Sequence, residues 1–140
     1  MEKIHMHTTI TRRMAQAAAA GAALLMLGGL GFVTAAPAAA ADKDGVLETG
    51  ELGLYYNSNF GGSVFDLALS DPNFANDRFP TSPSVSPDNN TASYDNRDIY
   101  AWQLCTDANY TGTCGRLLSG ANGNFSDVYK NKVTSARYLV

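Results

Sequence analysis

Apolar and aromatic runs of five to eight residues, separated by Gly, Asn, Asp and Ser, recur along the chain after residue 50. None of them continues into an apolar stripe with the 3.6-residue period of a helix. Short runs bounded by turn residues are typical of β-strands. The sequence therefore predicts an all-β domain, with strands in residues 52–57, 63–69, 99–105, 114–118 and 133–140.

Residues 71–90 (DPNFANDRFPTSPSVSPDNN) interrupt this pattern. The segment is rich in Pro, Asn and Ser, and its prolines remove the backbone donors that a strand needs. We expect one long surface loop here.

A hairpin pattern occurs twice. Residues 55–67 (YYNSNFGGSVFDL) and residues 105–117 (CTDANYTGTCGRL) align 50 positions apart. In both copies an aromatic residue, Phe60 or Tyr110, precedes a glycine by two positions. A glycine there permits a backbone conformation closed to other residues, and the aromatic ring can cover the turn. The repeat predicts two folded hairpins.

An amide-to-hydroxyl pattern also occurs twice. NNTAS (residues 89–93) and KNKVTS (residues 130–135) align 41 positions apart, which pairs Asn90 with Asn131 and Ser93 with Thr134. Each copy is expected to be a turn that enters a strand. The chain thus predicts two related halves, about 51–97 and 98–140, within one small domain.

The first 41 residues have the features of a signal peptide. Lys3, Arg12 and Arg13 precede an apolar stretch at 15–33, and AAPAAAAD then supplies small residues for cleavage. A membrane anchor is the alternative, since this stretch is nearly long enough to span a bilayer. We expect export and cleavage, so that the secreted chain begins at Asp42.

Cleavage restricts the chemistry of the mature chain. Both histidines leave with the leader, which excludes Ser-His-Asp sites and histidine-bound metals. Three of the ten basic and one of the thirteen acidic residues also leave, giving 7 basic and 12 acidic residues and a net charge of −5. Such a chain is a poor partner for nucleic acid or an anionic membrane. It is expected to act outside the cell as a monomer.

Two cysteines, Cys105 and Cys114, are present in the whole sequence. In an oxidising compartment they are expected to form a disulfide, and a domain of this size gains much from one. Two buried free thiols are the alternative.

Residues 42–50 (DKDGVLETG) are acidic and partly match a calcium-binding EF-hand loop. An EF-hand needs a helix on each side, whereas the predicted strand at 52–57 follows directly. We therefore expect residues 42–50 to be a flexible, solvated N-terminus.

Tyr55-x4-Phe60-x-Gly62, repeated with a cysteine at the first position of the second copy, resembles the Greek-key motif of βγ-crystallins. More narrowly, GELGLYYNSNFGGSVFDL, NNTASYDNRD and YKNKVTSARY resemble family 36 of the peptidase inhibitors, secreted actinobacterial proteins typified by an inhibitor of thermolysin-like metalloproteinases. The resemblance implies a βγ-crystallin-like double Greek-key β-sandwich. It also implies a peptidase as partner.

The crystallin resemblance further implies calcium binding through [Asn/Asp]-[Asn/Asp]-x-x-[Ser/Thr]-Ser. The matching residues are Asn90, Ser93, Asn131 and Thr134. Both motifs are incomplete and neither offers a carboxylate, and Lys130 adds a positive charge. We expect no cofactor, or at most weak calcium binding, with the amides and hydroxyls satisfying turn backbone groups.

The remaining carboxylates are scattered among turn residues, so an enzyme is not expected. The predicted function is inhibition of a metalloproteinase by a rigid, substrate-like loop. Phe79 and Val85 in residues 71–90, and Tyr110 between the cysteines, are the candidate contact residues, with Ser84-Val85 the preferred bond. Phe79 could instead pack over the core, as could Phe74. The alternative function is an extracellular binding module for calcium, cell envelope or a rival microbe.

Overall fold

The computed structural model describes residues 40–140, which form the all-β domain that the sequence predicts. The expected signal peptide, residues 1–41, lies outside the described residues except for its last two. No helix in the described part of the chain is long and apolar enough to cross a bilayer. The elements are β1 (Leu52–Tyr55), β2 (Val64–Leu67), the 3-10 helix η2 (Phe74–Asn76), β3 (Ser93–Asn96), β4 (Ala101–Asp107), the 3-10 helix η3 (Ala108–Tyr110), β5 (Thr111–Leu117), β6 (Asn122–Asn124) and β7 (Ser135–Leu139).

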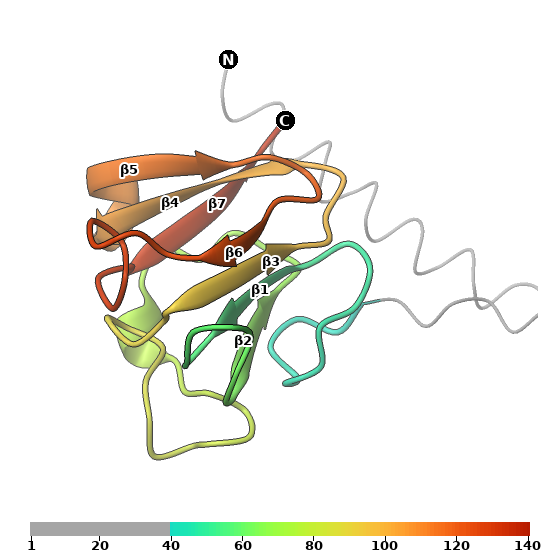
Figure 1. Cartoon of the computed structure of the whole chain (residues 1–140), viewed down its shortest axis with the longest axis vertical. Coiled ribbons are helices and arrows are strands. Elements are labelled where there is room, and N and C mark those ends of the chain that lie inside the picture. The colour runs from blue at the N-terminus through green and yellow to red at the C-terminus, as the bar shows by residue number, and fades with distance from the viewer. Residues whose placement is uncertain (1–39) are drawn as a thin grey trace, which may run out of the picture. The chain divides into compact units, whose positions relative to one another are not determined.

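The strands form two antiparallel sheets, in the orders β2-β1-β3-β6 and β5-β4-β7. Figure 1 shows the second group in the upper part of the view and the first group below it. Each half lends an element to the other half's sheet. β6 pairs with β3, and Asp71 bridges to Ala136 of β7 through backbone hydrogen bonds of 2.8 and 3.0 Å. This exchange produces the predicted double Greek-key sandwich.

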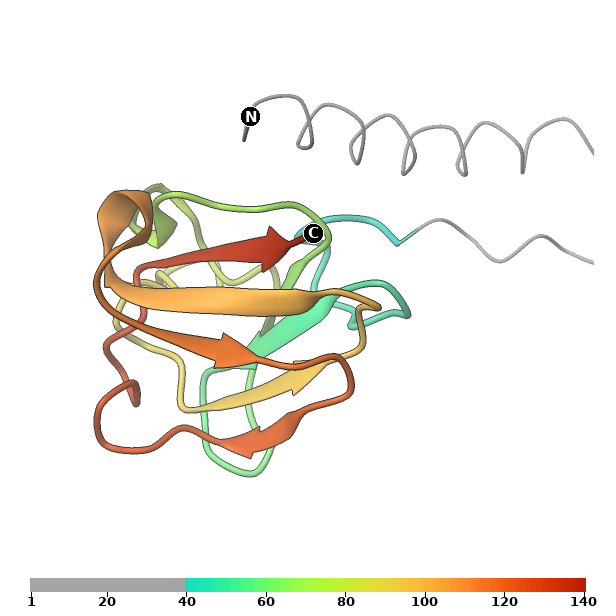
Figure 2. The same cartoon turned by 90° about the horizontal axis from the view of Figure 1, so that it is seen from above.

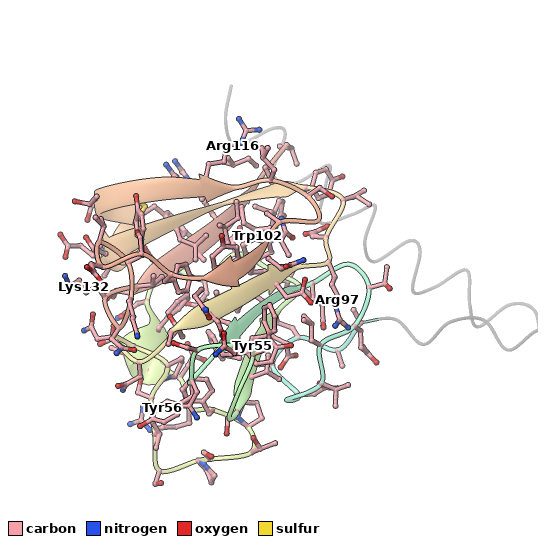
Figure 3. All side chains as sticks on the ribbon, viewed as in Figure 1. Tyr55, Tyr56, Arg97, Trp102, Arg116 and Lys132 are labelled. Carbon is pink, nitrogen blue, oxygen red and sulfur yellow. A yellow bond between two sulfur atoms is a disulfide. The ribbon has the colours of Figure 1, made fainter. Side chains whose placement is uncertain are left out.

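The core is built from alternate residues of the strands, as expected when one face of each strand is buried. Leu52 and Leu54 of β1, Phe65 of β2 and Trp102 of β4 are each 0% exposed, and Trp102 is labelled near the centre of the domain in Figure 3. Burying a large apolar side chain contributes roughly 1.5–3 kcal/mol. These four side chains therefore supply much of the free energy that holds the sheets together.

Residues 71–90 also contribute to this core, and they are more than the surface loop that the sequence predicts. Phe74 and Phe79 are both 0% exposed, and their ring centroids lie 5.1 and 6.4 Å from that of Phe65. Edge-to-face contacts of this kind add to the free energy of burial. The segment thus supplies two core aromatics that pack against β2.

Residues 42–50 were expected to be flexible, but they are bonded to the domain. The Lys43 N–H donates to the Asp66 carbonyl at 2.9 Å, and the Lys43 ammonium forms salt bridges with Asp71 at 2.6 Å and Asp77 at 2.9 Å. Burial acts to lower the pKa of Lys43, but these two carboxylates raise it above its ordinary value. Lys43 is thus paired with two carboxylates of the Greek key, and Asp42 accepts the Ala68 N–H there at 2.8 Å.

Glu51, at the start of β1, is a buried carboxyl group with incomplete hydrogen bonding. Its side chain is 0% exposed. Oε2 accepts the Glu48 N–H at 2.8 Å, whereas Oε1 has no hydrogen-bond partner among residues 40–140. Burial, with the nearby carboxylates of Asp66, Glu48 and Asp44 adding to it, raises the pKa of Glu51 to about 7.

This carboxyl group should make the domain less stable as the pH rises. A group whose pKa is higher in the folded state than in the unfolded state stabilises the protein fully below the unfolded pKa, near 4.5. That contribution is then lost as the pH rises through about 7. The loss is on the order of 3 kcal/mol between pH 4.5 and 7.5.

Glu51→Gln, which cannot ionise, should remove this component from the pH dependence. We expect urea unfolding to show the variant gaining stability relative to the wild type as the pH goes from 5 to 8. If the difference between the two proteins is the same at both pH values, Glu51 does not titrate in this range.

Candidate functional site

One serine folds the first hairpin back onto the sandwich. The Ser93 hydroxyl, at the start of β3, donates to the Asn57 carbonyl at 2.6 Å and accepts the Phe60 N–H at 3.0 Å. Phe60 has a φ of 59°, a conformation that costs a residue with a side chain free energy. The two hydrogen bonds hold the turn in this conformation.

The second hairpin is held in the same way. The Ser135 hydroxyl, at the start of β7, donates to the Asp107 carbonyl at 2.6 Å and accepts the Tyr110 N–H at 3.1 Å. Tyr110 has a φ of 61°, and Gly112 follows with a φ of 79°. The hairpin repeat at 50 positions is therefore present in the backbone as the sequence indicates.

The second repeat is spaced by 42 positions rather than 41. Asn89 and Asn131 both have a φ of 56°, and the serines that follow them by four positions both hold hairpins. The sequence alignment, which paired Asn90 with Asn131 and Ser93 with Thr134, was therefore wrong by one position. The sequence alone permits both alignments, because Asn89 and Asn90 are adjacent amides and Thr134 and Ser135 are adjacent hydroxyls.

The corrected alignment brings an acidic residue into the amide-to-hydroxyl motif. Asp88 now occupies the leading position of the first copy, and its Oδ1 accepts the Thr134 hydroxyl at 2.7 Å. The Asn89 Oδ1 lies 3.5 Å from the same hydroxyl. Asn90 points elsewhere and donates to the Ser86 carbonyl at 3.0 Å. Carboxylate, amide and hydroxyl oxygens are ligands that calcium accepts, so the types of oxygen at this position suit a calcium ion.

The equivalent position in the other half does not fit a cation. The spacing of 42 replaces Asp88 with Lys130 and Thr134 with Ala92. Both replacements line a surface cavity of about 220 Å³, together with Asn57 and other polar residues. Within residues 40–140, no three His, Cys, Asp or Glu side chains gather into a group that could hold a metal ion. Any calcium site is therefore single and incomplete.

The candidate contact residues of the long loop are not presented to solvent as a substrate would be. Phe79 is fully buried and cannot enter a peptidase subsite in this conformation. Val85 is half-buried and packs against the core. Its N–H donates to the Ser82 carbonyl at 2.9 Å, and its carbonyl accepts the Phe79 N–H at 2.9 Å. Both backbone polar groups of Val85 are therefore bonded within the loop, and its side chain serves the core.

The predicted disulfide is confirmed. Cys105 of β4 and Cys114 of β5 are directly opposite each other, with Cα atoms 4.1 Å apart. Tyr110, between them, is half-buried, and the Arg137 guanidinium lies 5.0 Å from the centre of its ring. Figure 2 shows this turn beside the start of residues 71–90, where the Asn109 N–H donates to the Pro72 carbonyl at 2.8 Å. The ring of Tyr110 therefore packs within the domain, against Arg137, rather than projecting from the turn.

A more exposed apolar surface, which the sequence pattern does not predict, lies at the other end of the strands. Residues 97–100, between β3 and β4, and residues 118–121, between β5 and β6, lie side by side at the right in both Figure 1 and Figure 2. We call them the paired end loops. Ile99 at 77% and Leu118 at 61% are strongly exposed. The available signal in the sequence is alternation: if the predicted strand at 99–105 buries Trp102 and Leu104, Ile99 falls on its outward face.

Comparison with solved structures places this fold among the βγ-crystallins. A structure described as "Evolution of the eye lens beta-gamma-crystallin domain fold" is 18% identical, covers 66% of this chain and 87% of its own, and has a TM-score of 0.54. The βγ-crystallin from Ciona intestinalis is 15% identical, covers 64% of this chain and 100% of its own, and has a TM-score of 0.51. A βγ-crystallin domain from Clostridium beijerinckii has values of 17%, 64%, 97% and 0.51. Identities this low show a shared fold alone.

The function class comes from the sequence family. No curated protein matches the chain. A model of peptidase inhibitor family I36 matches residues 40–117, more than half of the chain. The match begins at the N-terminal segment held by Lys43 and includes both folded hairpins. Its members are classed as inhibitors of peptidases rather than as enzymes, and such a role, like the disulfide, is consistent with an extracellular location. The chain therefore belongs to peptidase inhibitor family I36.

Proposed function

We propose that this protein is secreted and inhibits extracellular metalloproteinases of the thermolysin-like kind by placing a preformed loop in the active-site cleft. The observation that carries the proposal is the family match over residues 40–117. The metalloproteinase target follows from the resemblance of residues 50–67, 89–98 and 129–138 to the family typified by an inhibitor of thermolysin-like metalloproteinases. Enzymes of this kind accept a large apolar side chain after the scissile bond, and the domain exposes several such side chains.

The rigidity of the domain supports this mechanism. A loop that is already ordered loses little conformational entropy on binding, and it stays in place if one peptide bond is cut. Here the two serine bonds, the Cys105–Cys114 disulfide and the Lys43 salt bridges fix the connections between strands. A disulfide closing a loop of this size stabilises by roughly 2.5–3 kcal/mol.

A calcium-binding module is the second candidate function, favoured by one observation. Thr134 Oγ1 lies within hydrogen-bonding distance of a carboxylate, 2.7 Å from Asp88 Oδ1. Asp88, Asn89 and Thr134 would hold the ion, which would link the long loop to the approach to β7. The position offers one carboxylate only, so we expect a dissociation constant of about 10⁻⁴–10⁻³ M.

The main proposal is tested by incubating the chain from Asp42 onward with thermolysin and, separately, with trypsin and subtilisin. We expect stoichiometric loss of thermolysin activity at micromolar protein and none of trypsin activity. The protein reduced at its disulfide serves as a control and should inhibit less. Full thermolysin activity at every concentration would remove the metalloproteinase proposal.

Val85→Asp separates packing from contact with a peptidase. Because Val85 packs against the core, the aspartate should lower stability by about 1–3 kcal/mol in urea unfolding. The fraction that remains folded should inhibit as well as the wild type. If Val85→Asp has normal stability but does not inhibit, the peptidase contact lies in residues 71–90 instead.

Calcium at 2 mM should raise stability by only about 1 kcal/mol, because the site is weak. Asp88→Asn should abolish this increase, whereas Asp127→Asn, a change of equal charge at an exposed turn, should leave it intact. The thermal midpoint of each protein with and without calcium is the measurement. An increase of more than about ten degrees, or one that persists in Asp88→Asn, would contradict this assignment.

A further inference from the structure

We propose that the paired end loops form the peptidase-binding surface, and that Ile99 is the side chain that enters an apolar subsite of the metalloproteinase. This inference rests on the proposed function and names the surface that carries it out. The long loop and the disulfide hairpin, in which the sequence placed the contact residues, serve the core and the turn instead.

Exposure is the first observation. Ile99 has the highest exposed fraction, 77%, among the large apolar side chains that the structure describes, and Leu118 is 61% exposed. Single exposed apolar residues are common and need no explanation. These two are different because they project from loops that are hydrogen-bonded to each other: the Ser119 hydroxyl donates to the Asp98 carbonyl at 2.6 Å.

The backbone on both sides of Ile99 is fixed from beneath by a buried amide. Asn96 is 0% exposed, and its Nδ2 donates to the Tyr100 carbonyl at 3.0 Å and to the Leu118 carbonyl at 2.9 Å. Its Oδ1 accepts the Asp98 N–H at 3.0 Å. One buried side chain therefore joins both loops, in a place where water cannot compete for the bonds.

A buried carboxylate then ties the loop to the core. Asp98 is 3% exposed. Its Oδ2 accepts the Trp102 indole N–H at 2.9 Å, and its Oδ1 accepts the Tyr100 N–H at 3.3 Å. Since Trp102 is fully buried at the centre of the sandwich, Ile99 stands on a turn whose two flanking residues are both anchored. If the peptide bond before or after Ile99 were cut, both new ends would remain in place.

The charges near this turn favour an apolar subsite over an acidic one. Arg97 is the cation nearest to Ile99 along the chain, and its Nε is paired with Asp95 Oδ2 at 2.9 Å. Its Nη1 donates to the Leu47 carbonyl at 3.0 Å. Figure 3 shows Arg97 at the edge of the domain that carries these loops. The Arg97 guanidinium is thus bonded within the domain. The side chain of this turn that remains to enter a cleft is the branched hydrocarbon of Ile99.

Ile99→Asp and Leu118→Asp test the surface, with Val128→Asp as the matched control. Val128 is also an exposed apolar residue, at 50%, but it follows the opposite end of β6. We expect Ile99→Asp to raise the inhibition constant for thermolysin by about 30-fold or more, as for a central contact residue. Leu118→Asp should raise it by a smaller factor, and Val128→Asp should leave it within about twofold.

Two further measurements make the outcome decisive. Thermal midpoints should be nearly unchanged in all three variants, because the altered side chains are exposed. Mass spectrometry after long incubation of the wild type with thermolysin should show cleavage at the Asp98–Ile99 bond. Unchanged inhibition by Ile99→Asp, or cleavage at Ser84–Val85, overturns this surface while the proposed function stands. If the wild type does not inhibit thermolysin at all, the proposed function fails and this inference fails with it.

Discussion

The hydrogen bonds from a strand-entering serine to a folded hairpin are the constraint on which both halves depend. Phe60 and Tyr110 have φ angles of 59° and 61°, conformations that cost non-glycine residues of order 1–3 kcal/mol. They persist because the Ser93 and Ser135 hydroxyls accept the N–H groups of these same residues. Each serine also begins the last strand of its half. The bond therefore fixes the hairpin and the register of that strand together.

The two halves reinforce this shared constraint differently. In the first half, Tyr55 packs edge-on against Phe60, with centroids 5.7 Å apart. The equivalent of Tyr55 in the second half is Cys105, and the aromatic contact is replaced by the bond to Cys114. The departure from the crystallin pattern at this position thus replaces an aromatic contact with a disulfide. It leaves Tyr110 free to lie beneath Arg137.

The sequence predicts the hairpins well because glycine and aromatic residues at fixed spacing have few other uses. It predicts the surroundings less well. Phe74 and Phe79 lie among prolines and asparagines, so local composition hides their burial. The spacing of the second repeat depends on which of Asn89 and Asn90 takes a positive φ, and neighbouring amides do not reveal this. The sequence predicts Ile99 as the first residue of a strand, whereas β4 begins at Ala101 and Ile99 lies in the loop before it.

The two proposed sites lie at opposite ends of the same strands. The Asp88 and Thr134 oxygens lie next to the starts of β3 and β7, where the hairpins are held. Ile99 and Leu118 lie beyond the opposite end of β3, joined through Asn96. A cation at the first end could tie the long loop to the residues before β7 without touching the second. On the two proposals made above, calcium binding at the first end would leave the peptidase contact at the second unchanged. The anchoring of Ile99 needs no ion, because Asn96, Asp98 and Trp102 already satisfy one another in the interior.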